Sequence, residues 1–436
     1  MTDEAARMKI IRVGTTSGPV NIWRAAGAAT AGTLLEWYDY FIYGTAAALL
    51  WDKLFFPNLH GVAGLLASYS TFAVGFAVRP IGALVLSNLG DRIGRQPVLV
   101  GTLWLMGLSS AAIGFLPTYK SIGAWAPALL IFCRVLQGIG TGAQYSGALA
   151  LVTEFAPARA GLFGSFPAAT ADLAILCACG VFALVQSVVT PEQFLAWGWR
   201  IPFVLALLGL ALGQYLRSSI GETPEFLALK QSGAAVAQAP VKELLTRHWK
   251  LILIGMGASA SITGGYLYVV WSMSYVTLTL GMSRAVALDA TMIACGIAGV
   301  SAVAFGALSD RVGWRPIMLF GAVCAVLVPF PMFWLFQSRR PAAIYVGLTV
   351  AYSLGRAINA VQPKFFHELF PARLRYSGIA LAREPLQALF SGPMPFVATA
   401  LAAYYGSYVP VAWLMIVLAL FTVGTVACAP RRPFRD

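Results

Sequence analysis

Two carboxylates stand three residues apart inside an apolar stretch near the start of the chain. Glu36 and Asp39 belong to the run Leu35-Glu36-Trp37-Tyr38-Asp39-Tyr40. On a helix this spacing places both side chains on one face. Like charges so close repel each other, which favours proton uptake by one of them. The pair is therefore a candidate proton-coupling site, with Asp39 preferred. A structural ion pair with an arginine of a neighbouring helix is the alternative.

Two arginines also fall inside apolar stretches, where a charge is costly and therefore marks a functional candidate. Arg134 is a further candidate for proton coupling, because it can stabilise the charged form of a nearby carboxylate in one conformation. Arg356 precedes Glu368 by 12 residues, which on a helix is about 18 Å and reaches the middle of a bilayer. Its planar guanidinium suits a substrate carboxylate. The open alternative is a buried salt bridge with Glu384 or with an acid of the first helix.

Other polar side chains in apolar stretches complete the candidate site. Asp172 is an additional acid, and Arg383 and Glu384 are adjacent, so on a helix they need separate partners. Tyr268, Trp271 and Tyr275 recur at spacings of three and four and would share one face of a helix. Such aromatic residues can hold a substrate ring or a quaternary ammonium group; membrane anchors or gate plugs are the preferred alternative. The remaining candidate substrate-binding residues are Tyr38 and Gln144.

The composition excludes a water-soluble globular protein. Of the 436 residues, 59% are hydrophobic and 11% are charged, whereas soluble proteins carry about 25% charged residues. The net charge is +13, but the basic residues recur in short clusters between apolar stretches and form no patch for nucleic acid. The six cysteines all fall inside apolar stretches, which predicts packed thiols rather than metal ligands. We therefore expect a chain embedded in membrane lipid, with no metal and no nucleic-acid partner.

Charged and Pro/Gly-rich breaks divide the chain into twelve stretches long enough to span a bilayer, for which about 20 residues suffice. The predicted spans are 22–50, 62–86, 97–116, 123–151, 160–188, 199–218, 249–280, 286–308, 315–337, 342–366, 375–403 and 407–429. We therefore expect an all-α membrane protein of twelve helices in two pseudo-symmetric bundles. Its predicted parts are an N-terminal tail (1–21), an N-terminal bundle (22–218), a central cytoplasmic loop (219–248), a C-terminal bundle (249–429) and a C-terminal tail (430–436).

The distribution of basic residues predicts the orientation. With the N-terminus inside, twenty Lys and Arg residues fall in cytoplasmic segments and six in outer segments. The remaining basic residues lie within the spans. This bias places both termini in the cytoplasm and the chain in the inner membrane.

Two charged motifs recur in the two halves. Asp91-Arg92-Ile93-Gly94 has a counterpart in Asp310-Arg311-Val312-Gly313, 219 residues later, and Glu154-Phe155-Ala156-Pro157 has one in Glu368-Leu369-Phe370-Pro371, 214 residues later. The chain is therefore expected to be a duplicated six-helix unit. Ion pairs at such turns can close an inner mouth in one state and part in another; simple topogenic charges are the alternative. The predicted cytoplasmic gate comprises Asp91, Arg92, Arg95, Glu154, Arg159, Asp310, Arg311, Glu368 and Arg373.

At these residues the chain resembles the major facilitator superfamily, whose signature is the Asp-Arg turn after the second helix. Within it, the chain is most similar to the metabolite:proton symporter family, which includes carriers of shikimate, 2-oxoglutarate, citrate and proline/betaine. The matching stretches are 35–40, Phe76-Ala77-Val78-Arg79-Pro80-Ile81-Gly82, Arg134-Val135-Leu136-Gln137-Gly138, Gly198-Trp199-Arg200-Ile201-Pro202-Phe203 and Glu368-Leu369-Phe370-Pro371. The resemblance associates Arg134 with proton coupling. Two departures are Gln144, where the family has a glutamate, and Trp314, where it has arginine.

We expect a proton-coupled symporter for a small organic anion, working by alternating access, with no cofactor and as a monomer. The alternatives are a zwitterion or betaine symporter and an exporter of a small aromatic compound. A transporter-like sensor is disfavoured because the tails and the central gap are too short for a signalling domain. An enzyme is not expected, because His60, His248 and His367 are far apart and the sequence has no phosphate-binding loop or Ser/His/Asp set.

Overall fold

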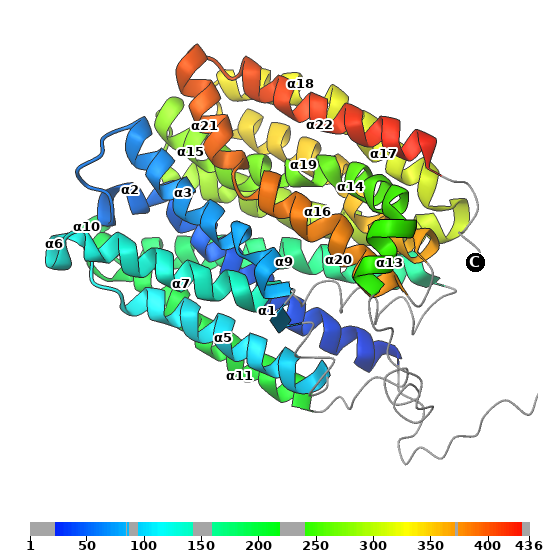
Figure 1. The fold of residues 1–436 in the computed structure, drawn as a ribbon. Helices are drawn as coiled ribbons and strands as arrows, with labels where there is room; N and C mark the ends of the chain where they lie inside the picture. The colour runs from blue at the N-terminus through cyan, green and yellow to red at the C-terminus, as the bar shows by residue number, and fades with distance from the viewer. Residues whose placement is uncertain are drawn as a thin grey trace, which may run out of the picture.

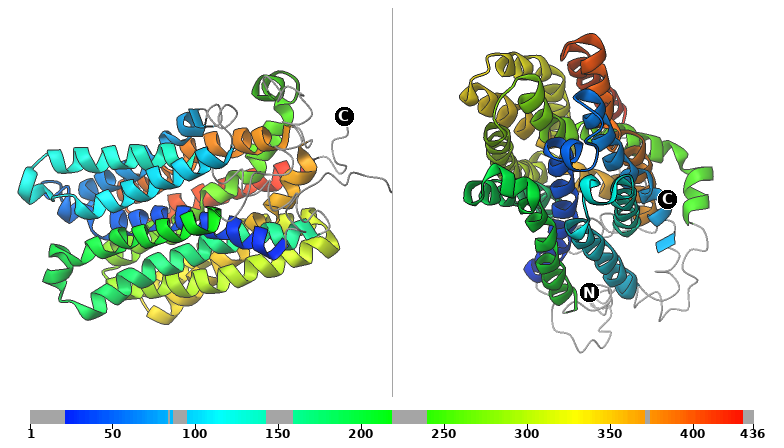
Figure 2. Two further views of the ribbon diagram at one scale, coloured as in Figure 1. Left: turned by 90° about the horizontal axis from the view of Figure 1, so that it is seen from below. Right: turned by 90° about the vertical axis from the view of Figure 1, so that its left-hand side faces the viewer.

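The computed structural model describes residues 22–83, 85–86, 95–142, 159–218, 240–370 and 374–429. Its helices lie side by side along one long axis (Figure 1), with the first half of the chain on one side and the second half on the other. The two perpendicular views in Figure 2 show the same lengthwise packing. The start of α1 and the end of α22 lie toward the same end of the molecule (Figure 1), which is consistent with the predicted orientation.

Every predicted span contains a helix. The long helices of the first half are α1 (Ile22–Leu49), α3 (Val62–Ala77), α5 (Arg95–Phe115), α7 (Trp125–Thr141), α9 (Ala160–Val188) and α11 (Ile201–Ser218). Those of the second half are α14 (Trp249–Thr263), α16 (Arg284–Val312), α17 (Trp314–Leu327), α18 (Pro329–Gln337), α19 (Pro341–Leu369), α20 (Arg375–Leu386), α21 (Met394–Tyr405) and α22 (Val409–Cys428). Short helices at the ends are α2 (Trp51–Leu54), α6 (Tyr119–Ile122), α10 (Pro191–Ala196) and α13 (Pro240–Arg247).

Seven of the described helical segments are long and apolar enough to cross a membrane, and the bent pair α17 and α18 makes an eighth. Shorter apolar helices lie at 100–115, 125–141 and 198–211. The bend of 41° follows Leu327 and falls where Pro329 begins α18, because proline cannot continue the hydrogen bonds of the preceding turn. The structure thus has the all-α membrane architecture that the sequence predicts.

Two spans of the second half change helical type midway. After α14 the chain continues as a π-helix, η3 (Leu267–Trp271), the short α15 (Ser272–Ser274) and a second π-helix, η4 (Tyr275–Thr279). The eleventh span likewise passes from α20 through the π-helix η6 (Gln387–Ser391) to α21. A π-turn rotates the side chains that follow it, and such turns concentrate at functional sites. The sequence analysis predicted these two segments as spans without placing π-helices in them, and the change of helical type alters which side chains face inward.

Small residues bring the two halves into close contact along α9 and α16. Ala168 of α9, Ala302 of α16 and Ala360 of α19 form one buried cluster. A Cβ added at Gly306 would lie 2.5 Å from the Ser165 side chain and 2.6 Å from the Gly161 carbonyl oxygen. In lipid, helices associate through this kind of backbone approach because the hydrophobic effect does not drive them together.

A valine at position 306 tests this packing. Because the added side chain has no room, Gly306→Val should destabilise the fold by about 1–3 kcal/mol and lower the thermal unfolding midpoint of the purified protein. Gly296→Val is the matched control on the same helix, since nothing lies within 4 Å of a Cβ there. Equal midpoints for the two variants would contradict the close contact.

Candidate functional site

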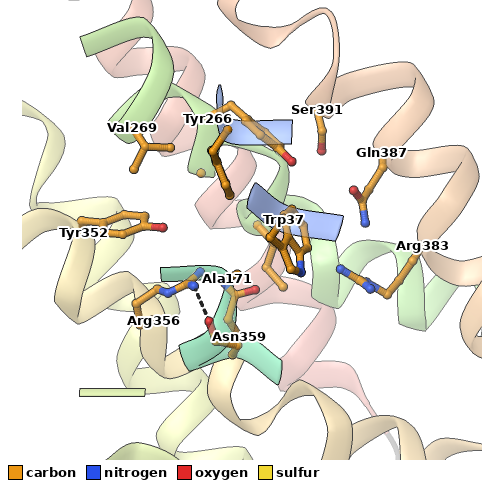
Figure 3. A pocket seen from close by; sticks show the side chains of 14 residues that line it. Trp37, Ala171, Tyr266, Val269, Tyr352, Arg356, Asn359, Arg383, Gln387 and Ser391 are labelled. Carbon is orange, nitrogen blue, oxygen red and sulfur yellow. Dashed lines mark hydrogen bonds between the residues drawn. The ribbon is translucent and has the colours of Figure 1, made fainter. Parts of the chain in front are cut away.

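A pocket lies between the two halves, in the middle of the molecule. It contains about 560 Å³ of space not filled by atoms, part of which is open to solvent. The first half contributes side chains from α1 and α9, and the second half contributes the rest, as Figure 3 shows. The lining residues are Trp37, Phe41, Ala168, Ala171, Ile262, Gly265, Tyr266, Val269, Tyr352, Arg356, Asn359, Arg383, Gln387 and Ser391.

Arg356 lines one wall of the pocket and is paired with Asp172 of the other half. Its Nε donates to Asp172 Oδ2 at 2.7 Å, and its Nη2 lies 2.7 Å from Oδ1. Tyr352 donates its hydroxyl to Oδ1 at 2.9 Å, and Arg356 Nη2 also donates to the Ala168 carbonyl oxygen at 2.9 Å. We call Asp172, Tyr352 and Arg356 the inter-bundle clasp. The predicted partners of Arg356 were Glu384 or an acid of α1; the partner is Asp172, because α9 packs directly against α19.

A second arginine faces the pocket from the opposite wall. Arg383 of α20 and Arg356 of α19 enter from the two sides of Figure 3, with Gln387 and Ser391 beside Arg383. Asn359 adds an amide one turn after Arg356. Among the described residues that line the pocket, none carries a carboxylate. The pocket therefore presents cationic and amide groups together with aromatic rings, which suits a small anion.

The predicted coupling residues lie together, but within the first half and outside the pocket lining. Asp39 is buried, accepts a hydrogen bond from the Ser110 side chain and interacts electrostatically with Arg134 and Glu36. Arg134 Nη1 donates to Gln137 Oε1 at 3.0 Å, and Gln137 Nε2 donates to the Ser110 hydroxyl. These bonds form a closed polar network in an otherwise apolar bundle. Of the predicted site residues Asp39, Arg134 and Arg356, only Arg356 lines the pocket.

Aromatic rings and a second buried arginine connect this network to the pocket. The Arg134 guanidinium stands 4.7 Å from the Tyr40 ring centroid, and Arg79 Nε donates to the Tyr40 hydroxyl at 2.9 Å. Arg79 Nη1 then donates to Oε1 of Gln387 in the other half, at 3.2 Å. The Arg79 side chain is buried at this interface between the halves.

The predicted aromatic face is divided by the π-helices. Tyr268 packs on Tyr352 at 5.9 Å between ring centroids. Trp271 and Tyr275 stack on each other and meet the Phe333 ring edge to face inside the second half. None of the three lines the pocket, and Tyr266 does so in their place. Tyr38 also lies elsewhere, because its hydroxyl donates to the Pro202 carbonyl oxygen within the first half.

One predicted gate residue joins the halves at the end expected to be cytoplasmic. The Asp310 carboxylate accepts hydrogen bonds from the backbone N–H groups of Gly161 and Leu162, at 2.8 and 2.9 Å. These groups begin α9, where the helix dipole favours an anion. Lys364 Nζ lies 3.2 Å from Oδ1. Asp310 of the second charged turn thus contacts a helix N-terminus and Lys364, a residue that the sequence analysis did not select.

The other gate candidates contribute less to this closure or lie outside the described residues. Glu368 accepts a hydrogen bond from Trp314 Nε1 at 2.8 Å, within the second half, which accounts for the tryptophan in the second charged turn. Gly313 there has φ of 86°, a conformation that glycine adopts without strain. Arg159 and Arg311 are exposed. Arg95 begins α5, and its side chain is not among those described. Asp91, Arg92, Gln144, Glu154 and Arg373 lie outside the described residues.

A periodic signal could have located the pocket residues that the sequence analysis missed. Arg383, Gln387 and Ser391 follow one another at intervals of four in an apolar span, and Asn359 follows Arg356 by three. Polar residues at helical spacing indicate one face directed away from lipid. Trp37 and Phe41 of α1 share a face by the same spacing, which differs from the face that carries Asp39.

The sequence is similar to those of known transporters. Residues 25–239 match the model of the family described as sugar (and other) transporter. The chain is 32% identical to the shikimate transporter of Escherichia coli K12 over 389 residues, covering 88% of each chain. It is 34% identical to the proline/betaine transporter of the same strain over 430 residues, covering 94% of this chain and 85% of the relative.

Solved structures of transporters share the fold. The D-xylose-proton symporter aligns with a TM-score of 0.70 at 21% identity, over 92% of this chain and 97% of that one. A partially occluded inward-open conformation of the Escherichia coli xylose transporter aligns with a TM-score of 0.68 at 19% identity. At these identities the likeness establishes the arrangement of helices.

Removal of the Asp310 charge tests the contact at the α9 terminus. Asp310→Asn weakens charge-assisted hydrogen bonds worth about 1.5–3 kcal/mol, so it should open this end and raise maleimide labelling of a Ser165→Cys reporter by about tenfold or more. The background carries replacements of the exposed Cys177 and Cys428. Asp289→Asn, an exposed acid on the same helix, is the control. Unchanged labelling after Asp310→Asn would exclude a closing role.

Proposed function

Because this chain belongs to the major facilitator superfamily, in the family of bacterial metabolite transporters that includes shikimate and proline/betaine carriers, we propose that it is a proton-coupled symporter of a small organic anion. The chain is a multi-pass inner-membrane transporter and not an enzyme. The proposal concerns the substrate, which we assign to the carboxylates, and the proton that accompanies it. Transport proceeds by alternating access of the pocket to the two sides of the membrane.

The single observation that carries the substrate class is the charge of the pocket wall. Arg356 and Arg383 line opposite walls of the pocket, and none of the described lining residues is acidic. A guanidinium binds carboxylates with paired, directional hydrogen bonds. Asn359, Gln387 and Ser391 supply further hydrogen-bonding groups, which would orient the rest of the molecule. An anion is favoured over a neutral sugar because it can form charge-assisted hydrogen bonds with these guanidinium groups.

We assign the coupled proton to Asp39, which is buried near Arg134 and Glu36. Arg134 compensates the ionised form, whereas burial and Glu36 disfavour it. The bonds through Tyr40 and Arg79 end on Gln387 of the pocket. Movement of the halves would break the bond between Arg79 and Gln387, and this provides a path by which pocket occupancy and the Asp39 network influence each other.

A zwitterion or betaine carrier is the second candidate, and the aromatic lining favours it. Trp37, Phe41 and Tyr266 lie at the pocket, with the rings of Phe41 and Tyr266 stacked at 5.9 Å. Aromatic faces bind quaternary ammonium groups, and a betaine carboxylate would still use an arginine. Uptake of glycine betaine without uptake of simple carboxylates would select this candidate.

Replacement of the pocket arginine tests the substrate class. In proteoliposomes, purified protein should take up a radiolabelled carboxylate, with shikimate, benzoate and succinate as the first probes. Arg356→Lys should reduce uptake at least tenfold, because lysine offers a point charge in place of the paired donors. Arg339→Lys, an exposed residue between α18 and α19, serves as the matched control. Uptake by Arg356→Lys equal to that of the control would eliminate a carboxylate grip at this residue.

Neutralising Asp39 tests the coupling. Asp39→Asn should abolish accumulation driven by an inward proton gradient and the alkalinisation of the medium that accompanies uptake. Counterflow exchange of labelled for unlabelled substrate should continue, since it needs no net proton movement. Asp52→Asn at the outer end of the first half is the control. If Asp39→Asn still accumulates substrate against its gradient, the coupled proton binds elsewhere.

A further inference from the structure

The inter-bundle clasp occupies the donors that a substrate carboxylate would need. Arg356 uses Nε and Nη2 on the two carboxylate oxygens of Asp172. The second hydrogen of Nη2 points to the Ala168 carbonyl oxygen. A guanidinium grips a carboxylate in a paired fashion through Nε and one Nη, or through both Nη groups. Both arrangements require Nη2, whose two hydrogens are already in use.

The clasp also differs from an ordinary structural ion pair in its location. Asp172 is fully buried on α9 of the first half, whereas Arg356 and Tyr352 lie on α19 of the second half and line the pocket. The pair thus joins two bodies that must separate on at least one side during transport. A Cβ added at Gly299 of α16 would lie 3.6 Å from the Asp172 side chain. The helix α16 therefore packs closely against the acid and leaves little room for water beside it.

An uncompensated arginine would oppose closure of the empty carrier. Removing one partner of a buried ion pair is strongly destabilising, because it leaves a buried charge without compensation. The empty symporter must nevertheless turn its pocket from one side of the membrane to the other, and it passes through a state in which the pocket is closed to both sides. Asp172 supplies the missing negative charge in that step, as a substrate carboxylate would in the loaded carrier.

We propose that Asp172 is an internal substitute for the substrate: its carboxylate occupies Arg356 in the empty carrier, and a substrate carboxylate must displace it to bind. This inference rests on the proposed carboxylate site at Arg356. It makes substrate affinity depend on the strength of the clasp. The apparent affinity equals the intrinsic affinity multiplied by the fraction of empty carriers in which the clasp is open.

Binding of simple carboxylates to the purified full-length chain tests this competition. The readout is the thermal unfolding midpoint against the concentration of sodium benzoate or sodium succinate, at constant ionic strength adjusted with sodium chloride. Asp172→Asn should lower the half-saturating concentration about tenfold, which corresponds to a clasp closed in about nine of ten empty carriers. A merely structural role for Asp172 would weaken folding without tightening the binding of an external carboxylate.

Companion variants separate the possible outcomes. Tyr352→Phe removes one hydrogen bond to Asp172 and should tighten binding by a smaller factor, which keeps the test available if Asp172→Asn fails to fold. Adding Arg356→Gln to Asp172→Asn should abolish the gain, and Asp289→Asn should match the wild type. The proposal is overturned if the wild type binds carboxylates and neither Asp172→Asn nor Tyr352→Phe binds them more tightly.

Failure of the proposed function gives a different pattern. If no carboxylate stabilises the wild type or any variant, the anion site at Arg356 is excluded, and the internal substitute with it. If Asp172→Asn binds more tightly but uptake proves independent of the proton gradient, the competition stands and the proton coupling does not.

Discussion

Compensation of buried charge is the constraint on which this structure depends. A charged side chain in the hydrocarbon region is costly unless the protein supplies a partner, and this chain buries several. Asp172 meets Arg356, Asp39 meets the network of Arg134, and Arg79 is held between Tyr40 and Gln387. Two of these three arrangements cross between the halves. The positions of the charges therefore tie the relative placement of the two bundles to the chemistry of the pocket between them.

Under the proposed competition, Arg356 has an anionic partner in both closed states. With the pocket empty, Asp172 neutralises Arg356; with an anion present, the ligand does so. The small residues Gly161, Gly306 and Ala302 allow α9 and α16 to approach closely, and Asp310 caps that approach at one end. Packing thus permits closure, and charge decides when closure is favourable, which is the kind of two-state contact that alternating access needs.

Much of the fold could be predicted from the sequence, because its signals are local. Apolar length gave the spans, and the limits of α9 agree with prediction at both ends. The repeated Asp-Arg turn predicted a duplicated unit. The changes of helical type inside spans could not be predicted, because nothing in the apolar run after Thr263 distinguishes a π-helix from an α-helix. Trp271 and Tyr275 lie in the π-helices η3 and η4 and stack on each other, whereas Tyr266, just before η3, lines the pocket.

The pairings of the site could be predicted only in part. Sequence identified Arg356 as a buried arginine and Asp172 as a candidate acid, yet it could not pair residues 184 positions apart, because that contact depends on how α9 packs against α19. The central claim is that a carboxylate binds between Arg356 and Arg383. Anomalous scattering from 4-bromobenzoate bound to crystals of the full chain measures this directly. The account predicts a bromine peak inside the pocket between these two side chains; a peak elsewhere, with the pocket empty at saturation, would contradict it.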